Sequence, residues 1–520
     1  MSKFRHLFFT MSQVRRRRGE KNQANEPLLV EDEVQTDTGS LALSLPGVII
    51  VVFLFRLVNA LTTRTFFQAD EYYQGLEPAH NYIFGYGYVT WEWREYLRSS
   101  IHPLVYAVGY KIVQVAFGDH LNSVIVAPKI IGAILATIAE VYLYKFVQVY
   151  KNERVARICL VLSLINPFNW YFITRAFSNS FETVLIIIAF KYWPWSNTKG
   201  RYYISLIFAI LSCIVRPTNG MIWMFLGLEY IFRVGISTKL VLGSAIEIIG
   251  VLGINTLLDY QFYGKLTFPV YNFLEFNVFK NLSIFYGVAP WHFYLVQAVP
   301  IMTMTLLPFL ILGLKWQLRD PLVQAGLVML VGFSFIDHKE FRFIYPLQPI
   351  MLMVAAKEID KKWRVRIRWI ALAMFVNVPI AFFLTQVNER GVLDILTYLP
   401  TDESVGFLTP CHSTPWQSHI HDPSINWWFL TCEPPLHLAS GTLENVKEYR
   451  DESDKFYDDP VTFLETLSDW PARIVVFSPL EDLMAQYPTY TMCHRIFNSV
   501  IHWDDRRSGD LLVYCRDEVI

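Results

Sequence analysis

Long apolar segments alternate with short polar connections over most of the chain. The first runs from about Leu43 to Leu61, and the others are of similar length. A helix needs about 20 mainly apolar residues to cross a bilayer. The pattern therefore predicts a polytopic α-helical membrane protein with about 11–13 helices. Its candidate spans lie near residues 43–61, 103–117, 123–146, 155–173, 178–193, 202–216, 219–235, 239–259, 293–314, 321–336, 343–356 and 369–386.

Basic residues in the connections orient these spans. Residues 1–40 are polar and contain Arg15-Arg16-Arg17-Arg18, which predicts a disordered cytoplasmic tail. The connection 357–368 is rich in Lys and Arg, so we expect it on the cytoplasmic side as well. The next span then places residues 387–520 on the lumenal side.

The orientations inferred from the two ends of the chain do not agree with the number of apolar segments between them. Residue 70 and the aromatic loop 260–292 are both expected in the lumen, which requires an even number of spans between them. The pattern contains seven apolar segments there. We therefore expect one segment, 103–117 or 178–193, not to cross as a separate span.

The composition changes after residue 387, where long apolar runs stop. Short apolar patterns at 473–477 and 511–514 are typical of buried strands, so a mixed α/β fold is expected. The predicted organisation is a tail (1–40), a membrane domain (41–386) with a first lumenal loop (62–102), and a soluble lumenal domain (387–520).

Composition supports the membrane assignment. The 520 residues are 53% hydrophobic and 16% aromatic, which is too apolar for an ordinary soluble chain of this length. The net charge of −1 excludes no class of protein. No basic domain with nucleic-acid motifs is present, so we expect no nucleic-acid partner.

Four of the six cysteines fall in the last quarter of the chain, at Cys411, Cys432, Cys493 and Cys515. In an oxidising compartment they are candidates for disulfides, and the sequence leaves three pairings open. Their spacing does not match a zinc finger or ribbon, so no metal site is predicted.

Asp70 and Glu71 are the first candidates for chemistry, because they lie just beyond the first span. A carboxylate there is suited to remove a proton from an attacking hydroxyl. The alternative is a pair of solvated acids at the end of a helix.

Aromatic and polar residues near these acids could bind a sugar phosphate. Trp91 and Glu92 could contact the sugar, and Arg98 and His102 the phosphate; Trp291 and His292 lie in a second aromatic loop. The alternative is an interfacial aromatic belt with cationic anchors. A further pattern, Asn281-Leu282-Ser283, is an N-glycosylation acceptor sequence.

A compact charged cluster interrupts two apolar segments at His338, Lys339, Glu340 and Arg342. Charges near membrane depth are costly and mark functional sites. Lys339 and Arg342 are three residues apart, so on a helix they would share a face and could hold a phosphate together. The alternative is a short polar turn.

Together, Asp70-Glu71, the run Thr90-Trp91-Glu92-Trp93 with Arg98, and His338-Lys339-Glu340 with Arg342 resemble a known family. It comprises the dolichyl-phosphate-mannose-dependent α-mannosyltransferases of the endoplasmic reticulum, which have the GT-C fold. The runs 410–415, 418–421 and 430–435 resemble the glycosylphosphatidylinositol (GPI) branch of this family, above all its members that add the third mannose.

The resemblance implies an α-1,2-mannosyltransferase that inverts the donor linkage, with Asp70 as the general base. It implies dolichyl phosphate mannose as the donor substrate, a GPI lipid intermediate with two mannoses as the acceptor, and no cofactor. Arg98, Lys339, Arg342 and His338 would hold the leaving phosphate. The protein would be a multi-pass glycoprotein of the endoplasmic reticulum membrane, surrounded by its lipids, with a cytoplasmic N-terminus.

Two other functions remain open. A mannosyltransferase of N-glycan precursor assembly would share the chemistry and use another acceptor. A lipid transporter should show repeat symmetry and charges near the midplane of the membrane, and neither is visible in the sequence.

Overall fold

The computed structural model describes residues 44–196 and 200–516, so the expected tail 1–40 lies outside it. Residues from Pro46 onward form one compact unit. The predicted membrane part and the predicted lumenal part therefore pack against each other rather than forming two separate bodies.

Helices coincide with the predicted apolar segments. They are α2 (Leu45–Thr62), α5 (Ile101–Ala116), α6 (Leu121–Tyr150), α7 (Glu153–Ile165), α8 (Pro167–Phe172), α9 (Ser178–Tyr192), α10 (Tyr202–Val215), α11 (Gly220–Val234), α12 (Thr238–Tyr263), α14 (Val299–Thr303), α15 (Leu307–Gln317), α16 (Pro321–Ser334), α17 (Gln348–Asp360) and α18 (Trp363–Phe382). Within the described residues, five helical segments are long and apolar enough to cross a membrane: Leu45–Thr62, Leu121–Tyr150, Thr238–Tyr263, Tyr294–Gln317 and Arg366–Tyr398.

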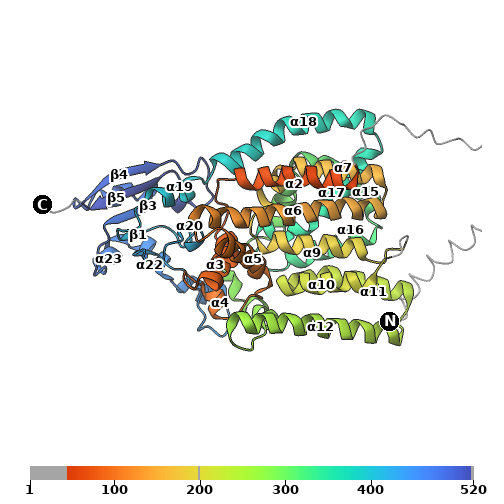
Figure 1. The fold of residues 1–520 in the computed structure, drawn as a ribbon, viewed down its shortest axis with the longest axis horizontal. Coiled ribbons are helices and arrows are strands. Elements are labelled where there is room, and N and C mark those ends of the chain that lie inside the picture. Colours follow the sequence, from red (N-terminus) through yellow and green to blue (C-terminus); the bar gives the residue numbers. More distant parts are fainter. Residues whose placement is uncertain (1–43, 197–199, 517–520) are drawn as a thin grey trace, which may run out of the picture. The chain divides into compact units, whose positions relative to one another are not determined.

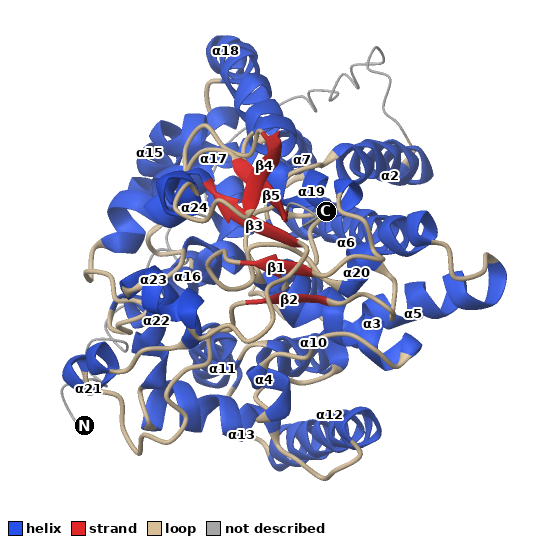
Figure 2. Ribbon diagram, turned by 90° about the vertical axis from the view of Figure 1, so that its left-hand side faces the viewer, coloured by secondary structure: helices blue, strands red, loops and turns tan. Residues whose placement is uncertain are grey.

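Helix α5 accounts for the conflict in the number of crossings. The helices α2, α6 and α12 run in about the same direction in Figure 1 and are seen nearly end-on in Figure 2, where α5 lies across the view. One side of α5 is exposed and apolar at Val108, Ile112 and Val115, whereas Tyr106 and Tyr110 on the other side are buried. A span at the edge of a bundle also exposes one apolar side, so the direction of α5 across the long helices (Figure 2) is what distinguishes it from a span. Without α5, the number of segments between residue 70 and loop 260–292 is even.

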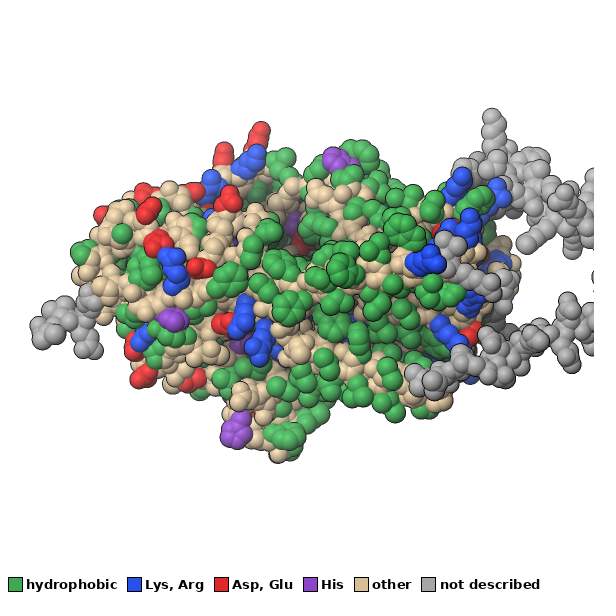
Figure 3. Space-filling model, turned by 90° about the horizontal axis from the view of Figure 1, so that it is seen from above, with side chains coloured by type: hydrophobic (Ala, Val, Ile, Leu, Met, Phe, Trp, Pro, Cys, Tyr) green, Lys and Arg blue, Asp and Glu red, His purple; other side chains and the backbone are tan. Residues whose placement is uncertain are grey.

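Hydrophobic side chains cover the surface formed by the long helices (Figure 3). Examples are Ile246 and Ile249 on α12 and Phe375 on α18, all largely exposed. Acidic and basic side chains gather over the strand-containing part, and Lys and Arg gather at the opposite end of the helices (Figure 3). The surface thus has the apolar belt that a bilayer requires.

The C-terminal region contains a five-stranded mixed sheet, and this confirms the predicted strands at 473–477 and 511–514. Its order is β2-β1-β3-β5-β4; β1 is parallel to β2 and β3, and β5 is antiparallel to β3 and β4. The strands are β1 (Val405–Phe407), β2 (Trp427–Phe429), β3 (Arg473–Phe477), β4 (Tyr490–Ile496) and β5 (Leu511–Arg516). Its helices are α19 (Gly391–Tyr398), α20 (Gln417–Ile420), α21 (Leu443–Glu448), α22 (Glu452–Asp458), α23 (Pro460–Glu465) and α24 (Glu481–Met484).

The two faces of the sheet pack against different partners. Val475 and Val513 face a core shared with the first connection, which contains η1 (Tyr72–Leu76), α3 (Glu77–Phe84) and α4 (Trp91–Arg94). Ile474 and Leu512, one position along each strand, face a second core that includes Phe456 of α22. Because successive side chains of a strand point to opposite faces of the sheet, the apolar run in each strand contributes residues to both cores. The sheet thereby fixes the first connection, which carries Asp70.

Candidate active site

A cavity of about 390 Å³ lies between the first connection, the segment after α16 and the C-terminal region. Aromatic walls come from Phe273 and Phe276, in the connection formed by α13 (Pro269–Leu274), η3 (Glu275–Phe279) and η4 (Leu282–Tyr286). The acidic and cationic side chains in its lining include Asp70, Glu92, Arg98, Arg216, Glu340 and Arg342. A cavity with apolar walls and a few convergent charged groups is the usual form of a site for a small ligand.

Asp70 and Glu71 face different environments. The chain is already helical at these residues, so neighbouring side chains point in different directions. Asp70 lines the cavity and forms an ion pair with Arg342. Glu71 does not line it; its carboxylate is buried and accepts a hydrogen bond from Nη1 of Arg175 at 2.8 Å. Burial raises the pKa of Glu71, and the charge of Arg175 opposes this.

Arg342 connects two carboxylates. It lies at the start of η7 (Phe341–Leu347), and its Nε and Nη2 donate to Glu340 at 2.8 and 2.7 Å. Burial disfavours the charged guanidinium, but Asp70 and Glu340 outweigh this effect and raise the pKa of Arg342. Its Nη1 is buried without a hydrogen-bond partner among the described residues. The guanidinium therefore keeps one strong donor atom that none of the described protein groups satisfies.

Glu340 is held in its charged form. It also contacts His338, with 3.2 Å between Oε1 and Nε2, and accepts a hydrogen bond from Gln68 at 3.2 Å. Burial alone would raise its pKa, but Arg342 and His338 hold the pKa of Glu340 well below its usual value. The carboxylate therefore neutralises and orients Arg342 rather than acting as a proton acceptor.

A second guanidinium–carboxylate pair lines the cavity. Nε and Nη2 of Arg98 donate to Glu92 at 3.0 and 2.7 Å, and Gln74 donates to the same carboxylate at 3.4 Å. Trp91 also lines the cavity, and its ring packs on Phe276 at 4.8 Å. These placements bring together the predicted residues of the first connection.

Arg216 is a cavity residue that the sequence reasoning missed. It ends α10, is buried, and lies 4.9 Å from the centre of the Phe343 ring. No carboxylate lies within ion-pair distance of it among the described side chains. The available signal was the Arg216-Pro217 pair, which places a charge between two apolar segments.

The expectation that Lys339 and Arg342 share a helical face is wrong. Glu340 has an extended backbone, with φ −132° and ψ 152°, and the helix begins only at Phe341. Nζ of Lys339 instead donates to the carbonyl oxygens of Ala289, at 2.8 Å, and Ile336. Lys339 does not line the cavity. It ties the segment before η7 to loop 287–290.

Three further predicted residues lie outside the cavity lining. His102 is buried in α5 against Tyr106, Trp291 is largely exposed, and His292 is partly exposed. None of them contacts the acidic pairs described above, whereas His338 lines the cavity with Glu340.

The acceptor sequence at Asn281 lies beside the cavity. Asn281 is partly exposed and belongs to the cavity lining, whereas Ser283 is only 5% exposed. Glycosylation of Asn281 stays a prediction.

The four C-terminal cysteines form two disulfides, Cys411–Cys432 and Cys493–Cys515. This result confirms the expected disulfides and selects one of the three pairings. Among the described residues, one His/Cys/Asp/Glu group is compact enough to hold a metal ion, namely Cys411, His412 and Cys432. Its two sulfur atoms are bonded to each other, so it offers no pair of thiolates.

The C-terminal region closes the cavity from one side. His412 and Cys432 belong to its lining. The hydroxyl of Tyr73 donates to the carbonyl oxygen of Thr414 at 3.0 Å. Glu77 of α3 accepts hydrogen bonds from the backbone N–H of Trp416 at 2.9 Å and from the hydroxyl of Ser418 at 2.6 Å. These contacts fix the first connection, and with it Asp70, to the sheet domain.

Residues 47–421 match the family described as "Alg9-like mannosyltransferase family". The chain is 54% identical over 524 residues to GPI mannosyltransferase 3 of Debaryomyces hansenii, covering 93% of this chain and 95% of that protein. It is 52% identical to GPI mannosyltransferase 3 of Candida albicans (92% and 100%) and 35% identical to that of Saccharomyces cerevisiae (89% and 94%). Among solved structures, ArnT from Cupriavidus metallidurans bound to undecaprenyl phosphate matches with a TM-score of 0.54 at 10% identity, covering 90% of this chain and 97% of ArnT, which shows a shared GT-C fold.

Proposed function

The chain belongs to the Alg9-like mannosyltransferase family, and from this we propose that it transfers mannose from dolichyl phosphate mannose to a GPI lipid intermediate with two mannoses. The new bond would be α-1,2, and the product would carry the third mannose of the GPI core. The acceptor assignment is supported by relatives over 50% identical, which are named GPI mannosyltransferase 3 and align with more than nine-tenths of the chain.

The observation that carries the mechanism is the position of Asp70 in the cavity, next to Arg342 with its unpartnered Nη1. Asp70 removes the proton from the 2-hydroxyl of the acceptor's second mannose. The hydroxyl oxygen then attacks the anomeric carbon of the donor. The bond from this carbon to the phosphate oxygen breaks, and its electron pair leaves with dolichyl phosphate. In-line attack inverts the β linkage of the donor to α.

Arginines of the cavity would stabilise the leaving phosphate. Arg342 offers its free Nη1, and Arg216 carries a positive charge with no carboxylate partner among the described residues. Charge-assisted bonds from guanidinium to phosphate are among the strongest hydrogen bonds in proteins. Because the donor arrives as a phosphate ester, these cations favour the charge that develops on it. In this assignment Arg216 takes the role first expected of Lys339.

Donor binding would also activate Asp70. In the structure without substrates, Arg342 is shared between Asp70 and Glu340. A phosphate competes for this guanidinium and draws it away from Asp70. The Asp70 carboxylate is then free to accept the acceptor's proton at the moment when the donor is in place. Glu71, paired with Arg175, would position this segment and take no part in the chemistry.

The site would lie on the lumenal side of the endoplasmic reticulum membrane. Lys and Arg gather at the end of the helices that is opposite the sheet domain (Figure 3), and positively charged connections favour the cytoplasmic side. Asp70, the cavity and the sheet domain are then on the lumenal side, and the N-terminus is cytoplasmic.

Complementation tests this function. Cells that lack the enzyme for the third mannose would receive the wild-type chain, Asp70→Asn or the matched control Asp119→Asn, which changes an exposed aspartate outside the cavity. At equal expression, we expect the wild type and Asp119→Asn to restore GPI lipids with three mannoses and Asp70→Asn to accumulate the two-mannose lipid. Restoration by all three chains would remove Asp70 from the role of base. If N-glycan precursors change while GPI lipids do not, the acceptor assignment is wrong.

A further inference from the structure

His412 is a polar residue of the cavity that the mechanism leaves without a role. It comes from the C-terminal region, and its ring packs on Tyr73 with 4.2 Å between ring centres. The residue keeps some exposed surface, but its Nδ1 is buried and has no hydrogen-bond partner among the described residues. Buried polar atoms are nearly always paired, so an unpaired nitrogen on a residue that lines the cavity makes this residue a candidate for ligand binding.

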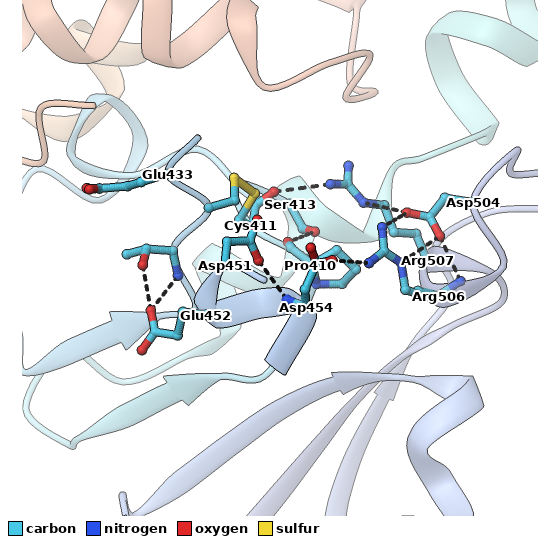
Figure 4. Close-up of a disulfide and its surroundings, with 12 residues drawn as sticks. Pro410, Cys411, Ser413, Glu433, Asp451, Glu452, Asp454, Asp504, Arg506 and Arg507 are labelled. Atoms are coloured by element: carbon cyan, nitrogen blue, oxygen red, sulfur yellow. Dashed lines mark hydrogen bonds and ion pairs between the residues drawn. A yellow bond between two sulfur atoms is a disulfide. The ribbon is translucent and has the colours of Figure 1, made fainter. Parts of the chain in front are cut away.

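The backbone of His412 also marks a functional position. Its φ is 53°, in the left-handed region that only a few per cent of residues other than Gly adopt. The preceding residue is held by two contacts (Figure 4): Cys411 is bonded to Cys432, and Arg507 donates to the carbonyl oxygen of Cys411 at 3.1 Å. Residues forced into such conformations cluster at ligand-binding and catalytic sites.

The chemistry of the ring selects an uncharged ligand. Burial and the nearby charge of Arg507 lower the pKa of His412 to about 3, so the imidazole is neutral at physiological pH. A neutral imidazole offers one donor and one acceptor nitrogen, which suits a hydroxyl group better than a phosphate. The phosphate is already served by Arg342 and Arg216. Tyr73, which contacts His412, and Gln74 also line the cavity and are likewise uncharged groups of the kind that bind sugars.

We propose that His412 is a specificity-determining residue, whose imidazole forms a hydrogen bond with a hydroxyl of the acceptor's mannose. The inference rests on the proposed mannosyl transfer and adds the location of the acceptor side of the cavity. It also gives the C-terminal region a role in selecting the acceptor, because the 411–432 disulfide loop carries the recognition group.

The test measures the KM for each substrate separately on the purified full-length protein. The donor is dolichyl phosphate mannose, and the acceptor is the two-mannose GPI lipid. His412→Phe keeps an aromatic ring and removes the nitrogens; we expect the KM for the acceptor to rise about tenfold. The KM for the donor should stay within about twofold of the wild type. His437→Phe is the matched control, since His437 is exposed and outside the cavity, and we expect it to change neither constant.

Two more variants separate the ring from the backbone. Asn tolerates a left-handed backbone and supplies a donor and an acceptor, so His412→Asn should restore much of the acceptor affinity. His412→Gly accepts the backbone equally well but lacks the polar group, so it should behave like His412→Phe. An unchanged acceptor KM in both His412→Phe and His412→Gly overturns the proposal, as does an equal rise in both KM values.

The acceptor that the wild type mannosylates shows whether the proposed function has failed, independently of the role of His412. If the wild type mannosylates an N-glycan precursor and not the GPI lipid, the proposed acceptor is wrong. The same variants then decide the role of His412 by the KM of that precursor: an increase in His412→Phe supports it, and no change overturns it.

Discussion

Asp70 and Arg342 form an ion pair that joins the first connection after α2 to the segment after α16. Most of the membrane helices lie between these residues in the sequence, so the pair exists only when the helical bundle is assembled. Arg342 is almost fully buried, whereas about a quarter of the Asp70 side chain remains exposed. The carboxylate is therefore the member of the pair that a substrate reaches first.

We expect Arg342→Lys to impair use of the donor although it keeps the charge. Lysine cannot replace the guanidinium fork that contacts Glu340 twice and leaves Nη1 free. The predicted loss is about 100-fold in kcat/KM for dolichyl phosphate mannose. Arg216→Lys should also lower this kcat/KM.

The matched control is Arg319→Lys, because Arg319 is exposed and outside the cavity. Kinetics with a varied donor and a saturating acceptor measure the effect. Donor kinetics like those of the wild type in Arg342→Lys and Arg216→Lys would show that neither guanidinium contacts the phosphate.

Glu71→Gln should reduce stability much more than chemistry. The change leaves the buried Arg175 without its carboxylate partner, and breaking a buried ion pair from one side costs about 3–5 kcal/mol. Arg175 also donates to the carbonyl oxygen of Thr65 at 2.7 Å, so the effect extends to the start of the first connection.

Thermal unfolding of the purified protein, together with transfer activity per folded molecule, separates the two effects. We expect Glu71→Gln to unfold at a lower temperature and to keep clearly more activity per folded molecule than Asp70→Asn. A stable but inactive Glu71→Gln would instead place Glu71 in the chemistry.

The fold could be predicted largely from apolar periodicity, because a bilayer requires long apolar helices and buried strands require short apolar runs. Hydropathy could not distinguish α5 from a span: its apolar face, with Val108 and Val115, is exposed along one side only, and the average over the segment hides this. Orientation of a helix depends on what it packs against, which a window of sequence does not contain.

The site could be predicted in part. Asp70 was identified as a carboxylate just beyond the first span, and Glu92 and Arg98 as possible ligands of a sugar phosphate near it. Arg342 was identified because it belongs to a charged cluster between two apolar segments, where charges are costly. Arg216 and His412 were missed because their roles arise from contacts between distant segments. Lys339 was misplaced since the helix that would align it with Arg342 begins one residue after Glu340.

The contact between α3 and the C-terminal region should make the stability of the protein depend on pH. Glu77 is 1% exposed and accepts hydrogen bonds from Trp416 and Ser418. Burial raises its pKa to about 7, and those hydrogen bonds offset only part of the effect. Burial lowers the pKa of the neighbouring His419 to about 3. The unfolded chain therefore protonates His419 below its ordinary pKa of about 6.5 while the folded protein does not, which makes stability rise with pH over part of the same range. Only the difference between the wild type and a Glu77 variant isolates the contribution of Glu77.

The direction in which stability changes with pH follows from the protons that the folded and unfolded states bind. Between the unfolded pKa of about 4.5 and the folded pKa of about 7, the folded protein holds a proton on Glu77 that the unfolded chain releases. Stability is therefore highest below pH 4.5 as far as this group is concerned, falls as pH rises to about 7, and is constant above it. The shift corresponds to about 3 kcal/mol.

Unfolding of the purified protein from pH 5 to 8 measures this dependence. We expect the stability of the wild type relative to Glu77→Gln to fall by about 3 kcal/mol between pH 5 and 8, because glutamine cannot titrate yet keeps an oxygen for Ser418. Glu444→Gln changes an exposed glutamate and should show the same dependence on pH as the wild type. A difference between the wild type and Glu77→Gln that does not change with pH would mean that Glu77 is ionised in the folded protein at pH 5, and that its hydrogen bonds to the C-terminal region outweigh its burial.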